Sequence, residues 1–214
     1  MEWLHRFVDL FLHLDKSLAN VIRDYGVWTY GILFLIVFCE TGLVVTPFLP
    51  GDSLLFAVGA FAAKGSFDPW LAGGLLTVAA VVGDTVNYWI GYCFGPRLAV
   101  KYPRLIKKEH LEKTHAFYEK YGAETIILCR FVPIVRTFAP FVAGFGTMSY
   151  RKFFLYNVVG GVLWVVLLMG GGMLFGQLKF VQENFGMVEL MIVVISVLPM
   201  VVEFIRARRK SGVS

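Results

Sequence analysis

The segment Cys129–Gly146, with the sequence CRFVPIVRTFAPFVAGFG, combines two features that few folds tolerate together. Among mostly apolar and small residues it carries two arginines and two prolines: Arg130, Arg136, Pro133 and Pro140. An arginine in the middle of a plain membrane-spanning helix costs about 2.5–3.5 kcal/mol, and a proline inside a helix removes a backbone donor. Broken backbone and charge are tolerated at membrane depth only inside protein or beside a water-filled cavity. We therefore predict a re-entrant hairpin over residues 123–146 whose arginines bind an anion.

The composition indicates a membrane protein, because 57% of the 214 residues are hydrophobic, only 16% are charged, and the mean hydropathy is +0.69. This length suits a single membrane domain over residues 1–214. Lys and Arg number 20 against 15 Asp and Glu, but they gather in loops, which is the pattern of membrane topology rather than of nucleic-acid binding. The three cysteines form no CxxC motif, so we expect neither a metal site nor a cofactor.

Hydrophobic periodicity predicts an all-α chain. Residues 1–25 alternate apolar and polar positions at helical spacing, which favours an amphipathic helix lying on the membrane. Four apolar runs suit spanning helices, over residues 27–45, 71–95, 153–178 and 187–205. Residues 46–63 form a second broken apolar segment, which contains Pro50 and Gly51. A polar loop over 96–122 and a basic tail over 206–214 complete the chain.

The distribution of basic residues predicts the topology, since loops rich in Lys and Arg stay in the cytoplasm. The 96–122 loop has seven basic residues and the tail has four of the 20, so both should be cytoplasmic. The spans 153–178 and 187–205 already supply the even number of crossings that must separate them. Segment 123–146 therefore enters from the cytoplasm and returns, while 46–63 enters from the outer face. Both termini are then cytoplasmic.

Short matches between the two halves predict an inverted repeat, over residues 27–95 and 123–178. Phe48-Leu49-Pro50 matches Phe131-Val132-Pro133, and Gly91, Phe94 and Gly95 match Gly172, Phe175 and Gly176. One crossing separates the two units, so the repeats must have opposite orientations. Inverted repeats whose broken segments meet near the bilayer midplane are typical of transporters.

Four ionisable residues lie on or beside the broken segments: Glu40, Asp52, Arg130 and Arg136. Such residues are candidates for function by default. In one interpretation the carboxylates pair with the arginines only to lock the hairpins together. In the other, the arginines bind a phosphate with bidentate geometry, and the carboxylates compete with it and take up protons. Asp52 can instead cap a helix, because it follows Pro50-Gly51.

A second polar pair, Asp84 and Asn87, shares one helix face with Gly83 and Gly91. Small residues favour close helix packing, so we interpret this pair as polar packing rather than as a direct substrate contact. The glycine-bearing spans 71–95 and 153–178 could support a homo-oligomer or pack against each other within one chain. No histidine occurs in a predicted spanning or re-entrant segment, which argues against a lipid phosphatase, and we expect no enzymatic activity.

Four motifs resemble the bacterial DedA family and, more distantly, eukaryotic VTT-domain lipid scramblases. They are ETG at Glu40–Gly42, PFLPGDSLL at Pro47–Leu55, GDxxNYxxG at Gly83–Gly91 and RFVPxVRTxxPxxAG at Arg130–Gly144. The resemblance implies two opposed re-entrant hairpins in the bacterial cytoplasmic (inner) membrane, and a role in moving lipids across it. Several members of that family act in recycling undecaprenyl phosphate. The family's essential acidic and basic positions map onto Glu40, Asp52, Arg130 and Arg136.

With what the resemblance implies, these observations predict a translocase that returns undecaprenyl phosphate, or a related anionic lipid phosphate or phospholipid, across the membrane, with proton coupling chemically available. Arg130 and Arg136 would bind the head group. Glu40 and Asp52 would couple protons or form ion pairs. The residues expected to support the site are Pro50, Gly51, Pro133, Pro140, Asp84 and Asn87. The alternative is a proton-coupled carrier of small solutes or drugs that supports the membrane potential, in which Glu40 and Asp52 are the primary sites.

Overall fold

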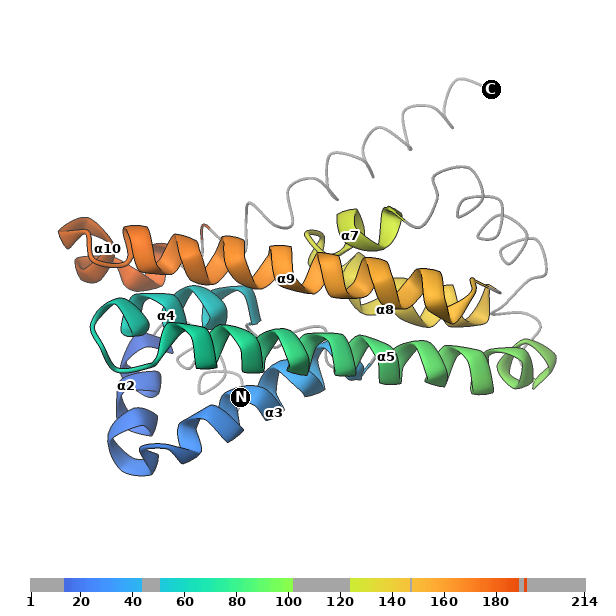
Figure 1. The fold of residues 1–214 in the computed structure, drawn as a ribbon, viewed down its shortest axis with the longest axis horizontal. Helices are drawn as coiled ribbons and strands as arrows, with labels where there is room; N and C mark the ends of the chain where they lie inside the picture. The colour runs from blue at the N-terminus through green and yellow to red at the C-terminus, as the bar shows by residue number, and fades with distance from the viewer. Residues whose placement is uncertain (1–13, 44–50, 102–123, 147, 189–190, 192–214) are drawn as a thin grey trace, which may run out of the picture. The chain divides into compact units, whose positions relative to one another are not determined.

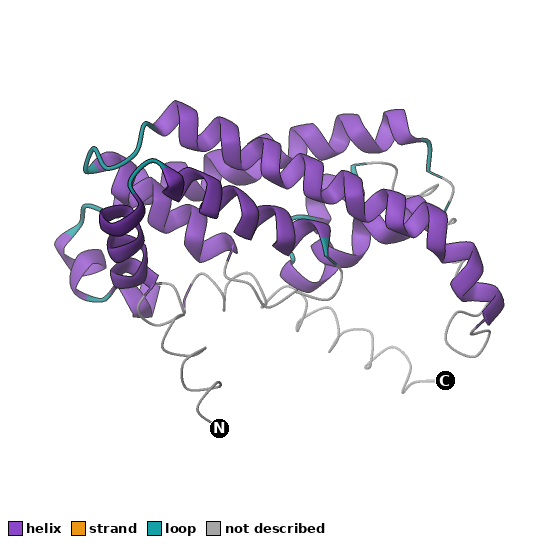
Figure 2. Cartoon of the chain, turned by 90° about the horizontal axis from the view of Figure 1, so that it is seen from below, coloured by secondary structure: helices purple, strands orange, loops and turns teal. Residues whose placement is uncertain are grey.

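The computed structural model describes residues 14–43, 51–101, 124–146, 148–188 and 191, and every regular element in this part of the chain is a helix (Figures 1 and 2). This confirms the all-α prediction for the described residues. The helices with defined bounds are α2 (Leu14–Tyr25), α3 (Trp28–Gly42), α4 (Gly51–Ala63), α5 (Pro69–Lys101), α7 (Thr125–Cys129), α8 (Pro133–Phe145), α9 (Tyr150–Phe175) and α10 (Lys179–Glu183).

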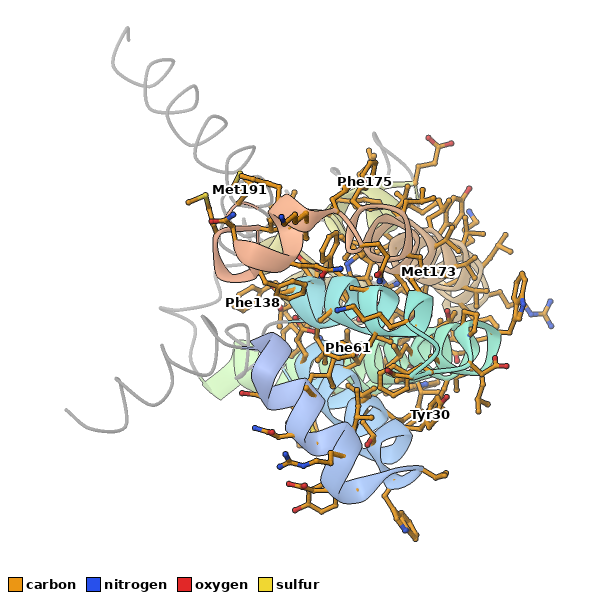
Figure 3. All side chains as sticks on the ribbon, turned by 90° about the vertical axis from the view of Figure 1, so that its left-hand side faces the viewer. Tyr30, Phe61, Phe138, Met173, Phe175 and Met191 are labelled. Atoms are coloured by element: carbon orange, nitrogen blue, oxygen red, sulfur yellow. The ribbon has the colours of Figure 1, made fainter. Side chains whose placement is uncertain are left out.

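Two helices are long and apolar enough to cross a membrane, Pro69–Gly95 within α5 and Tyr150–Phe175, which is α9. They agree with two of the four predicted spans. The span predicted over 27–45 corresponds to the shorter α3, while most of 187–205 lies outside the described residues. Large apolar side chains are exposed in many elements, and Figure 3 labels three of them, Phe138, Phe175 and Met191. Exposed apolar side chains of this number suit contact with lipid rather than water.

Helix α5 continues past Gly95 to Lys101, so residues 96–101 are helical and the polar loop does not begin at Pro96 as predicted. The predicted loop began at Pro96, and a proline does disfavour a helix interior. The residues that follow, Arg97, Leu98 and Ala99, are strong helix formers and carry the helix onward. The remainder of the predicted loop, 102–122, lies outside the described residues.

The chain divides into two compact units, which combine segments from distant parts of the sequence. The first unit comprises Met1–Thr29, Pro50–Pro69 and Leu168–Ser214, and the second comprises Tyr30–Leu49 and Trp70–Leu167. Each unit therefore takes segments from both halves of the predicted repeat.

In the first unit, α4 is the central helix, and ten of its 13 residues are buried. The amphipathic α2 packs on it and buries Leu18, whereas its Arg23 and Asp24 form an exposed ion pair. The predicted amphipathic helix is thus present over 14–25, and its first 13 residues lie outside the description. The end of α9 approaches α4 so closely that a Cβ on Gly59 or Gly172 would overlap the backbone of the other helix.

In the second unit, α8 packs against α5 in the same manner. A Cβ on Gly91 would overlap the carbonyl oxygen of Phe141, and one on Gly144 would overlap that of Tyr88. Beside this contact the Tyr88 hydroxyl donates a hydrogen bond to the Met148 carbonyl at 2.6 Å, and its ring stacks on Phe153 at 4.6 Å between centroids. Small residues thus let two helix backbones approach closely, as in many membrane helix pairs.

The repeat prediction matches one glycine from each contact, Gly91 with Gly172, and it also matches Gly95 with Gly176. In the first unit Gly176 also lies against Ala60, and in the second Gly95 lies against Phe145. The recurrence of one packing device at matched positions supports the repeat. The inverted repeat and the course of both broken segments through the bilayer stay predictions.

Replacing Gly172 with valine should destabilise the protein by at least about 1–3 kcal/mol, because the new side chain meets the backbone of α4 rather than a movable side chain. The matched control is Gly170→Val, two residues away on the same helix, where a Cβ would meet nothing within 4 Å. Thermal unfolding of the purified protein in detergent measures the difference. Equal melting temperatures for the two variants would contradict the close contact.

Candidate functional site

Segment 123–146 is broken into two helices, as its prolines predict. Helix α7 ends at Cys129, Arg130 to Val132 form a turn, and α8 begins at Pro133. Proline suits the first turn of a helix, because its missing N–H would have no partner there in any case. Helices α7 and α8 pack against each other, which agrees with a hairpin. The break places Arg130 in the turn and Arg136 in the first turns of α8.

Arg130 is 3% exposed and is held by groups from two other helices of its unit. Its Nη2 donates to Asp84 Oδ2 on α5 at 2.6 Å, and its Nη1 donates to Asn157 Oδ1 and to the Asn157 carbonyl on α9 at 3.0 and 3.1 Å. Asn157 is itself fixed, since its Nδ2 donates to the Val81 carbonyl at 3.0 Å. The guanidinium thus has a charged partner and a neutral one, as a buried charge requires.

Two glycines of α9 make room for the Arg130 side chain. A Cβ on Gly161 would lie 3.5 Å from Arg130 Nη1, and one on Gly160 would lie 3.6 Å from Arg130 Cδ. By itself, a glycine pair in an apolar helix favours only close packing or flexibility. The structure gives it a specific neighbour, because a larger residue at either position would press on the arginine.

Arg136 forms the second ion pair of the unit. Its Nη2 donates to Glu40 Oε1, near the end of α3, at 2.5 Å. Both side chains are almost fully buried, at 6% and 1% exposure. Pro140 lies one turn further along α8 and, without an N–H, cannot donate to the Arg136 carbonyl. The second proline therefore interrupts the backbone hydrogen bonding of α8 beside the charged residue.

Helix α3 and helix α5 approach each other closely beside these ion pairs. A Cβ on Gly83 would overlap the Thr41 hydroxyl, and one on Gly42 would lie 3.3 Å from Gly83 Cα. Asn87 then joins three elements, because its Nδ2 donates to the Thr41 carbonyl of α3 at 3.2 Å and to the Thr137 carbonyl of α8 at 2.7 Å. Because Thr41 follows Glu40 and Thr137 follows Arg136, this amide links the two backbone segments that carry the ion pair.

A tryptophan of α9 completes the cluster. Trp164 is 1% exposed, and its ring centroid lies 4.8 Å from Arg136 Cζ and 5.7 Å from Arg130 Cζ. The cluster therefore consists of two buried guanidiniums, two buried carboxylates, two asparagines and one aromatic ring. Its formal charges balance. An anion that binds the Nη2 groups of these arginines competes with Asp84 and Glu40 for them.

The structure brings together five of the predicted site residues in the second unit: Glu40, Asp84, Asn87, Arg130 and Arg136. Asp52 and Gly51 belong to the first unit, at the start of α4, and Pro50 lies outside the described residues. Glu40 pairs with Arg136, which was one of the pairings that the sequence left open. The functional roles of all these residues stay predictions.

Sequence reasoning assigned Asp84 to helix packing, although the structure makes it the partner of Arg130. Its position was the available signal, since a carboxylate in the middle of an apolar span needs a partner wherever it is buried. Sequence reasoning also missed Asn157, although an amide side chain in an apolar helix likewise indicates a buried polar contact. Nothing in the sequence pattern indicates that Trp164 contacts the arginines or that the Thr137 carbonyl accepts from Asn87, because such contacts depend on how separate helices pack.

Comparison with known proteins gives the family. The VTT domain matches residues 49–174. The chain is 53% identical to Protein DedA of Escherichia coli K12 over 99% of this chain and 98% of that protein. It is 45% identical to an uncharacterized membrane protein of Mycobacterium tuberculosis H37Rv, over 84% and 79% of the two chains. It is also 34% identical to Inner membrane protein YqjA of E. coli K12, over 78% and 79%.

No solved structure matches the chain. The VTT domain covers more than half of the residues and includes the whole charged cluster except Glu40. The match to Protein DedA extends over nearly the full length of both proteins. This chain therefore belongs to the DedA family of VTT-domain membrane proteins.

Proposed function

We propose that this protein is a transporter of the bacterial inner membrane that moves an anionic lipid phosphate between the leaflets, with undecaprenyl phosphate as its substrate. The observation that carries the proposal is the burial of two arginines beside a broken helix, each with one carboxylate partner. Guanidinium groups bind phosphate oxygens in bidentate fashion. The similarity to Inner membrane protein YqjA and the two helices of spanning length support the inner-membrane location.

The arrangement supports reversible anion binding because the arginines already have replaceable partners. A phosphate that displaces Glu40 or Asp84 gains charge-assisted hydrogen bonds, and the displaced carboxylate can return when the lipid leaves. Arg130 Nε is buried and has no hydrogen-bond partner within the described residues, so one donor is available without any exchange. Buried donors of this kind are rare and need an explanation. A phosphate oxygen would satisfy it.

A lipid is favoured over a small solute because the helices around the cluster present apolar side chains outward. Leu128 on α7 and Phe131 in the turn are exposed, as is Phe138 on α8. A phosphate head group could then reach the arginines while its hydrocarbon chain stays in the bilayer. The exchange of a carboxylate partner also permits proton uptake by Glu40, which is how coupling to protons would arise.

The alternative function is a proton-coupled carrier of small solutes, in which Glu40 and Asp52 are the primary sites. The buried position of Glu40 favours it. Liposomes with an imposed pH gradient separate the two proposals, because this carrier would move a water-soluble solute and leave the lipid phosphate in its original leaflet.

Neutralising Arg136 is expected to abolish lipid translocation. The protein is reconstituted into liposomes that contain labelled undecaprenyl phosphate, and a phosphatase that cannot cross the membrane is added outside. With the wild-type protein all of the lipid should be hydrolysed, whereas with Arg136→Gln only the share in the outer leaflet should react. The control is Arg23→Gln, an exposed arginine that pairs with its neighbour Asp24. Complete hydrolysis with Arg136→Gln would refute the assignment of this arginine.

A further inference from the structure

We propose that Trp164 is a positioning residue for the lipid head group, because its ring holds both guanidiniums in place while their carboxylate partners are exchanged for phosphate. This inference rests on the proposed function and assigns the site a residue that the motifs do not indicate. The ring belongs to α9, whereas Arg130 lies in the turn before α8 and Arg136 lies on α8. One side chain therefore contacts both arginines from outside their own segment.

The geometry is that of two cation–π contacts on one buried ring. The centroid lies 4.8 Å from Arg136 Cζ and 5.7 Å from Arg130 Cζ, and the residue is 1% exposed. Tryptophan is the strongest of the aromatic residues in this interaction, and shielding from water strengthens it. Two like charges near each other repel, so a shared ring that attracts both lowers the cost of keeping them together.

A contact with an aromatic face leaves the N–H donors of a guanidinium available to an anion, whereas an ion pair uses them. The N–H donors of a guanidinium point outward in its plane, and stacking does not use them. When Glu40 or Asp84 gives way to a phosphate, the contact with Trp164 can persist, and the arginine keeps its position. A carboxylate partner cannot do this, because it uses the same N–H groups as the anion.

The test compares Trp164→Phe, which keeps an aromatic face, with Trp164→Leu, which keeps only apolar bulk. Binding of a short-chain lipid phosphate to the purified protein in detergent is measured by titration calorimetry. Trp164→Leu should weaken binding of the lipid phosphate by about ten- to thirtyfold, and Trp164→Phe should weaken it by about threefold. The control is Trp89→Leu, a half-exposed tryptophan whose ring contacts those of Tyr88, Tyr92 and Tyr150. It should bind like the wild type.

The outcomes separate this inference from the proposed function. The order wild type, Trp164→Phe, Trp164→Leu in affinity supports the positioning role, even if the phosphatase assay then shows no translocation. Equal affinities for wild type and Trp164→Leu overturn it and leave the proposed function standing. Equal losses in the phenylalanine and leucine variants also overturn it, because apolar shape rather than the ring's affinity for cations would then matter. If Trp164→Leu does not fold, the comparison of Trp164→Phe with the wild type decides. No binding by the wild type overturns both proposals.

Discussion

Replacing Asp84 with leucine is expected to lower the free energy of unfolding by about 3–5 kcal/mol, because Arg130 then stays buried without its carboxylate. Asn157 would still accept from the guanidinium, but a neutral amide cannot balance its charge. Unfolding of the purified protein in mixed micelles measures the effect. The control is Asp24→Leu at an exposed ion pair, which should change the free energy of unfolding by less than about 1 kcal/mol.

The double variant Asp84→Leu/Arg130→Leu decides whether the loss comes from the stranded charge. With both charges removed, no buried ion lacks a partner, and the double variant should be more stable than Asp84→Leu alone. Replacement of a buried pair by apolar residues is often neutral or stabilising, so recovery close to the wild-type value is expected. A double variant that is less stable than Asp84→Leu would contradict this account. It would also show that Arg130 stabilises the protein mainly through contacts other than the one with Asp84.

Replacing Glu40 with glutamine is expected to strengthen the binding of a lipid phosphate, in the opposite direction to Arg136→Gln. The Glu40 carboxylate accepts a hydrogen bond from Arg136 Nη2, and an anion that binds this nitrogen must displace the carboxylate. Glutamine keeps a similar shape but makes a weaker, uncharged hydrogen bond. Loss of the competing charge should raise the affinity by about tenfold, which corresponds to about 1.4 kcal/mol. Titration calorimetry with a short-chain lipid phosphate measures it.

The sign of this change also separates the two candidate functions. If Glu40 instead serves as the proton site of a solute carrier, Glu40→Gln should abolish flux driven by a pH gradient and leave lipid-phosphate affinity unaltered. The matched variant is Glu124→Gln, at the exposed residue before α7, which should have the wild-type affinity. Weaker binding by Glu40→Gln would mean that the carboxylate assists the anion rather than competing with it.

Much of the fold could be predicted because local physics dominates it. Pro133 fixes where α8 begins, and the long apolar runs fix α5 and α9, since proline geometry and hydrophobicity depend on a few neighbouring residues. The predicted end of α5 at Gly95 was wrong, although it too depends on neighbouring residues. Arg97, Leu98 and Ala99 favour the helix and carry α5 past Pro96 to Lys101.

For the charged cluster, the sequence by itself determined which residues need partners. Arg130, Arg136 and Glu40 are too costly at membrane depth to lie there without a role, and this holds whatever the packing. It could not determine the partners. Only the tertiary structure decided that Arg130 pairs with Asp84 rather than with Glu40 or Asp52, and that Trp164 contacts both arginines. These choices depend on which faces of α3, α5, α8 and α9 meet, and glycines such as Gly83 and Gly91 control that by letting the backbones approach. Burial requires that each charge be balanced, but only the packing of the helices selects the group that balances it.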